Sequence, residues 1–211
     1  MGMTLTEKIL SSTSGEEAYA GDFVIANIDF AMSHDGTSPL TIEAFRRMGK
    51  DKVWDPDKIA FVIDHTAPSS SVGASAGHKM MKEFASEHGI GHFYYGEGIC
   101  HQLMIERGHV KPGTVVVGAD SDAVTYGCIG AFATGIGSTE MARVFMEGKL
   151  WFKVPETLRI FISGEFPERV TVKDFGLKMI GEIGMGGAAY QSVRYAGPAV
   201  KGMDIGKRMT L

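Results

Sequence analysis

Short apolar runs alternate with amphipathic stretches along the chain, and this alternation predicts strands followed by helices. Apolar residues at helical spacing predict helices over residues 4–12, 39–48, 75–88, 99–107, 141–146 and 171–183. Runs of β-branched and aromatic residues predict strands over residues 23–30, 58–63, 92–95, 114–118 and 157–163. A glycine-rich turn at Gly184 precedes one further predicted strand. Thr4 and Glu7 have the spacing of a capping box at the start of the first helix.

This order of elements favours an α/β fold in three layers (αβα), with helices on both faces of a mostly parallel sheet. We predict one such domain over residues 1–166 and the incomplete start of a second α/β domain over residues 167–211. A domain of about 45 residues is below the size at which a core usually holds itself together. We therefore expect this chain to be the first part of a longer one, with exposed apolar surface and a tendency to self-associate.

Composition narrows the class of protein. The 211 residues are 44% hydrophobic, and the net charge is −4 with scattered Lys and Arg, so a nucleic-acid partner is not expected. No apolar run approaches the roughly 18 residues of a membrane span, and the N-terminus lacks the pattern of a signal peptide. We predict a cytoplasmic protein without a membrane partner. The 28 glycines lie between apolar segments, which favours tight turns over disorder.

Cysteine and histidine usage bears on metal binding. The two cysteines, Cys100 and Cys128, match no zinc or iron–sulfur spacing, and we interpret them as buried small hydrophobes. The chain cannot hold a four-cysteine cluster by itself, and we predict no metal ligand in it. His78 and His88 fall in the polar part of the predicted helix over residues 75–88, and we interpret both as solvated.

Polar residues follow three of the predicted strands, where the carboxyl ends of parallel strands place ligands. They are His34 and Asp35, then Asp64 and His65, then Asp120, Ser121 and Asp122, with His101 at the start of a helix nearby. An Asp–His pair is a candidate acid–base couple, although each of these pairs can also be an ordinary turn. The helix that begins near His101 can also favour a bound carboxylate. Such convergence is typical of a hydro-lyase or a hydrolase.

Several motifs resemble one family. These are V-I-D-H-T, G-I-C-H-Q, the long segment K-P-G-T-V-V-V-G-A-D-S-D through G-I-G-S-T-E-M-A, and L-W-F-K-V-P-E-T-L-R-I. They resemble the aconitase superfamily, and are most similar to the large subunits of 3-isopropylmalate dehydratase and homoaconitase. The resemblance covers Thr4 to Leu211 and ends before the cysteines that would hold a cluster.

The resemblance implies a lyase of amino-acid biosynthesis, in leucine biosynthesis for the isopropylmalate type. Its reaction is the dehydration and rehydration of a hydroxy di- or tricarboxylate at a [4Fe–4S] cluster, whose cysteine ligands are absent here. The implied partners are the C-terminal half of the large subunit, a small swivelling-domain subunit and the carboxylate substrate. We expect this chain to be inactive alone.

By the same resemblance, Asp64 and His65 match the active-site pair, His101 matches a catalytic histidine, and Asp120 and Ser121 begin an Asp-Ser-His motif. A His101–Asp120 couple would favour the protonated ring as donor to the leaving hydroxyl. We assign His34 and Asp35 to substrate binding.

The motif departs from the family at Asp122, where the family has His. The carboxylate either impairs catalysis by repelling an anionic substrate or is tolerated through hydrogen bonds from nearby N–H groups. Two functions stay open: the N-terminal portion of a hydro-lyase large subunit, or a non-catalytic remnant that keeps a carboxylate pocket for binding or regulation. A hydrolase is disfavoured because no nucleophile-elbow pattern occurs.

Overall fold

Five parallel strands form the central sheet of the structure, a computed structural model that describes residues 2–211. Their order across the sheet is β4-β3-β2-β5-β6, and every neighbouring pair is parallel. The strands are β2 (Phe30–His34), β3 (Ile59–Ile63), β4 (His92–Tyr95), β5 (Val115–Gly118) and β6 (Phe132–Gly135). Parallel strands need crossover connections, and helices provide them here.

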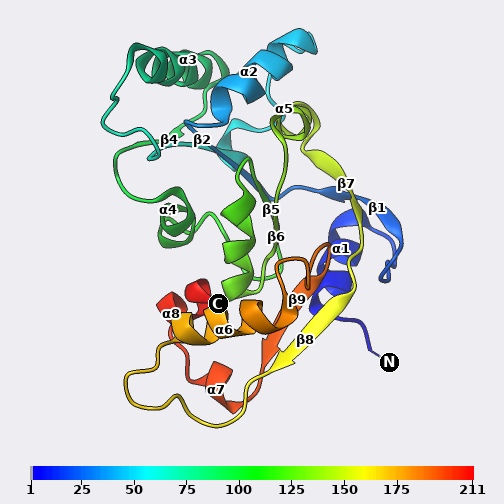
Figure 1. The fold of residues 1–211 in the computed structure, drawn as a ribbon. Helices are drawn as coiled ribbons and strands as arrows, with labels where there is room; N and C mark the ends of the chain where they lie inside the picture. The colour runs from blue at the N-terminus through cyan, green and yellow to red at the C-terminus, as the bar shows by residue number, and fades with distance from the viewer. Residues whose placement is uncertain (1) are drawn as a thin grey trace.

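Helices cover both faces of this sheet (Figure 1). One face carries α1 (Leu5–Ser14), α2 (Ser38–Arg47), α3 (Val72–His88) and α5 (Ser138–Glu147). The other face carries α4 (Cys100–Glu106) and a 3₁₀ helix, η2 (Ser121–Ile129). A short 3₁₀ turn, η1 (Pro56–Lys58), precedes β3. The predicted three-layer α/β fold is confirmed, as is the capping box of Thr4 and Glu7 at the start of α1.

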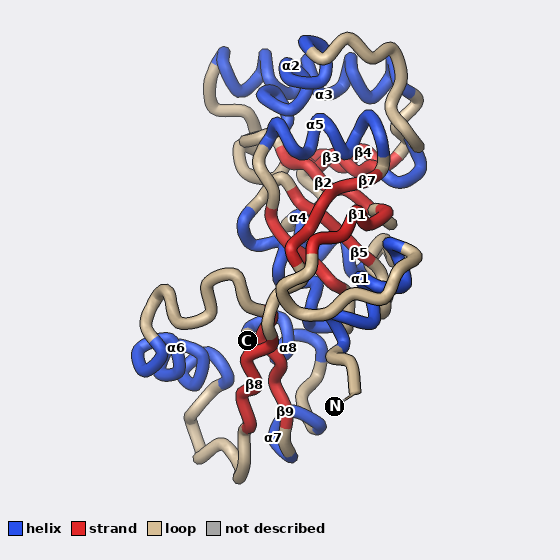
Figure 2. Tube along the Cα trace, turned by 90° about the vertical axis from the view of Figure 1, so that its right-hand side faces the viewer, coloured by secondary structure: helices blue, strands red, loops and turns tan. Residues whose placement is uncertain are grey.

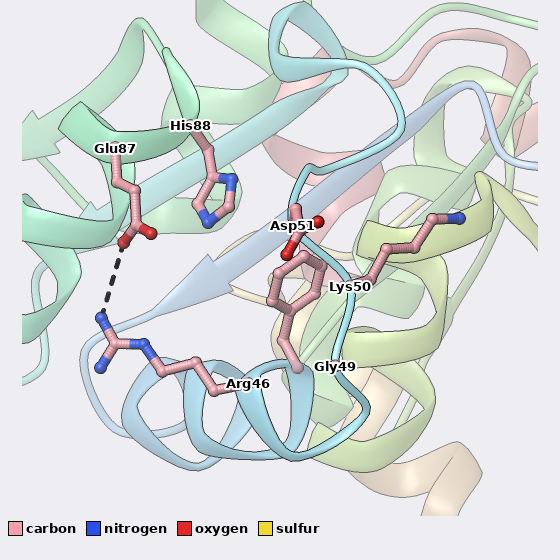
Figure 3. Close-up of a pocket in the computed structure, with 7 residues that line it drawn as sticks. Arg46, Gly49, Lys50, Asp51, Glu87 and His88 are labelled. Carbon is pink, nitrogen blue, oxygen red and sulfur yellow. Dashed lines mark ion pairs between the residues drawn. The ribbon is translucent and has the colours of Figure 1, made fainter.

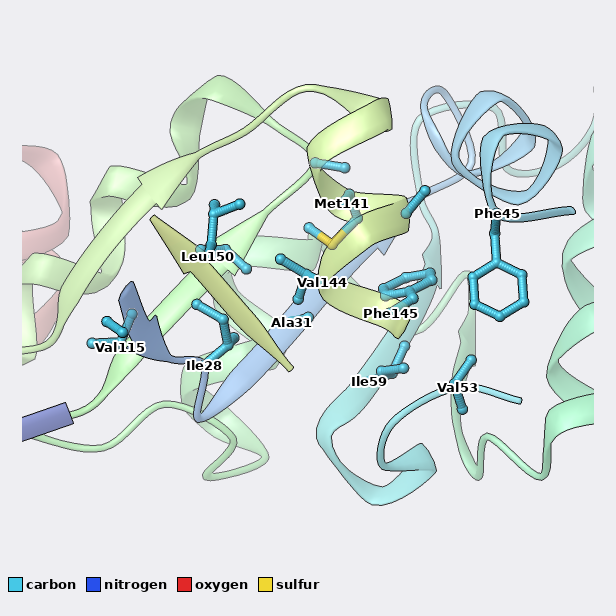
Figure 4. Close-up of a cluster of buried hydrophobic side chains, with 14 of the residues drawn as sticks. Ile28, Ala31, Phe45, Val53, Ile59, Val115, Met141, Val144, Phe145 and Leu150 are labelled. Carbon is cyan, nitrogen blue, oxygen red and sulfur yellow. The ribbon is translucent and has the colours of Figure 1, made fainter. Parts of the chain in front are cut away.

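Alternating side chains of β3 show why the sheet is buried on both faces. Ile59, Phe61 and Ile63 pack into the core beneath α2, α3 and α5, while Ala60 and Val62 pack into the core beneath α4 and η2. In Figure 4 the α5 side chains Met141, Val144 and Phe145 lie over the sheet within the first of these cores. A strand buried on both faces contains a continuous apolar run, which is why the sequence identified it.

The prediction of one strand over residues 23–30 was wrong, because two strands lie there. β1 (Phe23–Asn27) pairs antiparallel with β7 (Lys149–Lys153), and β2 begins at Phe30 in the main sheet. Burial alternates along β1 but is continuous along β2. Both patterns are apolar in sequence, so the change of sheet was not visible. The strands β6 and β7 were not predicted either.

The C-terminal part contains a separate two-stranded sheet (Figure 2). β8 (Thr157–Phe161) pairs in parallel with β9 (Ser192–Ala196), and the helices are α6 (Val172–Ile183), α7 (Pro198–Lys201) and α8 (Ile205–Thr210). The predicted boundary between residues 166 and 167 stays a prediction, and the pairing of β8 with β9 favours a boundary before Thr157. Leu177 and Ile180 of α6 are largely exposed. Among residues 2–211 there is no helix with the length and apolar character needed to cross a bilayer.

Candidate active site

The polar residues predicted at strand ends lie together at one edge of the central sheet. The chain runs from β2 to β3 and β4 on one side of the sheet, then returns to form β5 and β6 on the other side of β2. Open α/β sheets bind ligands at such a reversal of strand order. His34 ends β2, Asp64 follows β3, and Asp120 follows β5, so all three meet at this point.

His34 is a neutral imidazole in a fixed tautomer. Its Nε2 lies 3.1 Å from Oδ2 of Asp120, and the backbone N–H of Gly36 donates to its Nδ1 at 3.1 Å. Because Nδ1 accepts, the ring proton lies on Nε2 and is donated to the carboxylate. Burial of the ring, together with the nearby His65, lowers the pKa of His34.

His65 stacks on His34 but has the opposite electrostatic setting. The ring centroids lie 3.8 Å apart, and Nδ1 of His65 lies 2.8 Å from Oδ1 of Asp64. Partial burial opposes protonation, but the hydrogen bond to Asp64 and the surrounding carboxylates raise the pKa of His65 above its ordinary value. Its side chain is 44% exposed. The stacked pair therefore joins a neutral ring to one that favours its proton and faces solvent.

Asp64 also connects β3 to the start of α4. Its Oδ2 accepts the backbone N–H of Cys100 at 2.7 Å. The start of α4, where the sequence suggested a bound carboxylate, is therefore contacted by the carboxylate of Asp64. The next residue, His101, has Nε2 3.2 Å from Oδ1 of Asp120 and Nδ1 3.2 Å from the hydroxyl of the buried Tyr126. The pairing of His101 with Asp120 that the resemblance implied is present.

Asp120 is the common partner of three imidazoles. Besides His34 and His101, Nε2 of His65 lies 3.6 Å from its Oδ2, and the backbone N–H of Asp122 donates to its Oδ1 at 2.7 Å. Burial opposes ionisation, but this N–H and the imidazoles His101 and His34 lower the pKa of Asp120. An ionised carboxylate therefore stands among three imidazole rings.

Asp35 lies next to this cluster, and both of its carboxylate oxygens accept hydrogen bonds. Its side chain is fully buried. Oδ1 accepts the backbone N–H groups of Asp64 at 3.2 Å and of His65 at 3.0 Å, and Oδ2 accepts both the N–H and the hydroxyl of Thr66. Burial opposes ionisation, but these donors hold the pKa of Asp35 far below its usual range. Its oxygens are occupied by the turn that carries the Asp64–His65 pair.

A hollow of about 490 Å³ opens beside the cluster. It is lined by His34, Asp120 and Ser121 together with the loop of residues 135–138, which leads into α5. Gly135 allows this loop to approach closely, since a Cβ there would lie 2.5 Å from the carbonyl oxygen of Asp120. The Asp122 side chain is exposed, and its contact with Asp120 is made by its backbone N–H.

Two groups of side chains have ligand atoms close enough together for a metal ion. They are His34, Asp35, Asp64 and His65, and His101, Asp120 and Asp122. A histidine that ligates through Nε2 normally donates its other N–H to an acceptor, whereas Nδ1 of His34 receives a proton donor. The Asp35 oxygens are likewise occupied. The first group therefore favours hydrogen bonding over metal binding.

A second hollow, of about 290 Å³, lies away from these residues between α2, α3 and the segment after α2 (Figure 3). An exposed ion pair between Arg46 and Glu87 spans it at 3.8 Å. None of the predicted site residues lines it.

Three residues of the site were not predicted: Thr66, His78 and Tyr126. His78 was interpreted as solvated, but its side chain is only 11% exposed, and its Nε2 lies 3.0 Å from the Thr66 hydroxyl. The sequence position of His78 could have indicated this. It lies near the start of the helix that follows β3, and that helix begins at the edge of the sheet where the site lies. Tyr126 is fully buried, and a buried Tyr hydroxyl needs a partner.

A scan against protein-family models matches residues 7–211 to the aconitase family (aconitate hydratase). The chain belongs to the aconitase family. It is 56% identical to a 3-isopropylmalate dehydratase large subunit of Methanopyrus kandleri, which it matches over its whole length and over 51% of that protein. It is 49% identical to a probable methanogen homoaconitase large subunit of Methanothermobacter thermautotrophicus, with 99% of the chain and 50% of that protein covered. A 3-isopropylmalate dehydratase large subunit of Archaeoglobus fulgidus is 50% identical, with 51% of it covered.

This aconitase-family chain thus spans about half the length of the curated relatives it matches. Both of its cysteines are shielded from solvent, at least in part. Cys100 is fully buried, and burial together with Asp64 raises the pKa of its thiol, while Cys128 is half-buried with a thiol pKa raised mainly by burial.

Proposed function

We propose that this chain supplies the acid–base part of a hydro-lyase active site, as the N-terminal portion of a large subunit. The reaction is the reversible dehydration of a hydroxy di- or tricarboxylate of the 3-isopropylmalate or homoaconitate type. The partners are the C-terminal half of such a subunit and a small subunit. The names of the relatives support the reaction class, and the site geometry supports the roles of the residues.

The observation that carries the proposal is the convergence of His34, His65 and His101 on Asp120. Dehydration requires a proton donor for the leaving hydroxyl, and an effective donor has a pKa near the working pH. His65, whose pKa is raised, is such a group. Together with His34 and His101 it lies within 3.6 Å of one carboxylate, at the point where open α/β sheets bind ligands.

His65 is the proton donor in this proposal. Its pKa is raised, its side chain is the most exposed of the three, and its Nδ1 is held by Asp64, so Nε2 can present a proton to a ligand. The resemblance alone suggested His101 for this role. Both nitrogens of His101 already have partners, and its side chain is 13% exposed, so we assign it to the orientation of Asp120.

The remaining residues bind and orient. His34 donates to Asp120 from its fixed tautomer. His34 and Ser121 line the hollow and provide polar partners for a hydroxyl or carboxylate of the substrate. Asp35, assigned to substrate binding from the sequence, is proposed instead to position the Asp64–His65 turn, since its oxygens are occupied. The base that removes the carbon-bound proton is proposed to come from the small subunit.

The residues present do not fit as ligands of a [4Fe–4S] cluster. Four thiolates are the usual ligand set of such a cluster, and this chain has only two cysteines, Cys100 and Cys128. We therefore propose that the cluster of the complete enzyme is bound by residues outside this chain, and that residues 1–211 alone show no turnover.

A fusion tests the proposal. Residues 1–211 would be joined to the C-terminal half of the Methanopyrus kandleri relative, combined with the small subunit of that organism, and reconstituted anaerobically with iron and sulfide. Formation of the unsaturated acid, followed by ultraviolet absorbance, is the expected result. The unmodified relative serves as the positive control. An intact cluster without turnover in the fusion would contradict the proposal.

One observation favours a second function, that of a carboxylate-binding module without catalysis. Asp122 places an exposed carboxylate beside Asp120, where the family resemblance implies histidine. Its charge opposes an anionic substrate. In the fusion, Asp122→His would raise turnover at least about tenfold if this charge is the obstacle. Equal turnover with Asp and His at this position would remove the support for the second function.

A further inference from the structure

His78 lies outside the groups that face the crevice, yet it contacts the turn that carries them. The ring comes from α3, and its Nε2 is 3.0 Å from the Thr66 hydroxyl and 3.4 Å from Oδ2 of Asp35. The Tyr95 ring meets it edge-on, with centroids 5.8 Å apart. With 11% of its side chain exposed, His78 is held in one place by these contacts.

The direction of the hydrogen bonds follows from the partners. The Thr66 hydroxyl donates to Asp35, which is ionised and can only accept. The hydroxyl oxygen is then left to accept a proton donor, and Nε2–H of His78 is at hydrogen-bond distance from it. A directed chain therefore runs from His78 through Thr66 to Asp35.

Asp35 connects this chain of hydrogen bonds to the turn that carries Asp64 and His65. Its Oδ1 accepts the N–H groups of Asp64 and His65, which fixes the backbone of that turn. The turn in turn sets the 2.8 Å contact between Asp64 and Nδ1 of His65. The links meet at Asp35, whose side chain is fully buried, while Thr66 and His65 are partly exposed to solvent. Displacement of one end is therefore passed to the other through Asp35.

We propose that His78 is a positioning residue for His65, acting through Thr66 and Asp35. The inference rests on the proposed role of His65 as proton donor, but it can be tested without turnover. It adds a residue that touches neither the crevice nor the other two imidazoles of the cluster in any described contact.

The test compares His78→Gln with His78→Leu in the 211-residue chain. A Gln side chain can donate an N–H from a position near that of the imidazole Nε2, whereas Leu fills space without donating. The matched control is His88→Leu on the same helix, because His88 is half-buried against Phe45 and Phe84 and has no contact with the turn. Both Leu substitutions thus remove a half-buried imidazole ring.

Hydrogen exchange of the backbone amides of Asp64, His65 and Thr66 is the first measurement. Exchange in His78→Leu should rise about fivefold to tenfold, as expected for one lost hydrogen bond, and His78→Gln should restore it to within about threefold. The second measurement is the NMR signal of the Nδ1–H proton of His65, which should be lost or broadened in His78→Leu and retained in His78→Gln.

Unchanged exchange and an unchanged His65 signal in His78→Leu would overturn the inference. An equal effect in His88→Leu would do the same, because it would show a general loss of packing. If His78→Leu fails to fold, the comparison of His78→Gln with the wild type decides, since altered exchange there would show that donation is not what matters. Turnover of the fusion tests the proposed function, whereas these measurements need no turnover, so the two proposals fail separately.

Discussion

Asp35 and Asp120 are both buried carboxylates at neighbouring strand ends, yet their surroundings differ. Asp35 follows β2, and its shortest hydrogen bonds come from backbone N–H groups and a hydroxyl, which do not titrate near neutral pH. The imidazoles of His78 and His65 lie further from it, at 3.4 Å and 3.8 Å. Asp120 follows β5 and is surrounded by three imidazoles and one N–H. The pKa of each is lowered, against the effect of burial.

Because their partners differ, the two carboxylates are suited to different roles. Donors that do not titrate near neutral pH provide the shortest hydrogen bonds to Asp35, so it can hold a turn over a wide range of pH. Asp120 also contacts the partly exposed His65, whose pKa is raised, so its environment can change when a ligand or a proton arrives. Asp35 is thus proposed to position a turn, whereas Asp120, which follows the neighbouring strand, is proposed to take part in the chemistry.

The largest expected effect is that of Asp35→Asn. An amide NH₂ would face backbone N–H donors in a fully buried position, and the free energy of unfolding at pH 7 should fall by about 3 kcal/mol. Urea denaturation measures it. Because the pKa of Asp35 is depressed in the folded protein, the contribution is present above the unfolded pKa of about 4 and is lost as pH falls below it.

The control for this variant is Asp51→Asn, at an exposed residue beside the smaller hollow of Figure 3. Its free energy of unfolding should stay within about 0.5 kcal/mol of the wild type. A loss below about 1 kcal/mol for Asp35→Asn would remove the contrast between the two carboxylates.

Gly135→Ala tests whether the Asp120 region depends on close backbone approach. The added Cβ would lie 2.5 Å from the carbonyl oxygen of Asp120 and 2.9 Å from Cα of Ser121, and neither backbone atom can move easily. A loss of about 2 kcal/mol in the free energy of unfolding is expected, with shifted imidazole NMR signals for His34 and His101.

Gly127→Ala, in the same glycine-rich segment, is the control, since a Cβ there meets nothing within 4 Å. It should change stability by no more than about 0.5 kcal/mol. Similar losses for both variants would mean that the close approach to Asp120 does not set the cost.

The sequence predicted which strand ends carry polar residues, because buried parallel strands have continuous apolar runs and their carboxyl ends meet at one edge. It could not predict what each carboxylate contacts. Asp35 and Asp120 both follow an apolar run, and the partners of Asp35 are backbone N–H groups, which every residue but proline has. Only the geometry of the turn distinguishes them.

Other errors have similar causes. His78 was interpreted as solvated because Lys and Glu surround it in sequence, but helical geometry turns its ring towards Thr66. The division of residues 23–30 into β1 and β2 was missed because both strands are apolar, and their pairing with β7 and β5 is a long-range property. Local periodicity does not contain such information.

Asp120→Asn is expected to have the smallest effect on stability and the clearest dependence on pH. The raised pKa of His65 stabilises the fold below the unfolded value of about 6.5, and this contribution is lost as pH rises through the folded pKa. The lowered pKa of Asp120 contributes above about 4. Both charges are therefore present together between about pH 4 and 6.5, where the variant should lose about 1 kcal/mol. The loss should shrink at pH 8, and the pKa of His65 in an NMR titration should fall. Equal losses at pH 5.5 and 8 would show that Asp120, like Asp35, is held mainly by partners that do not titrate.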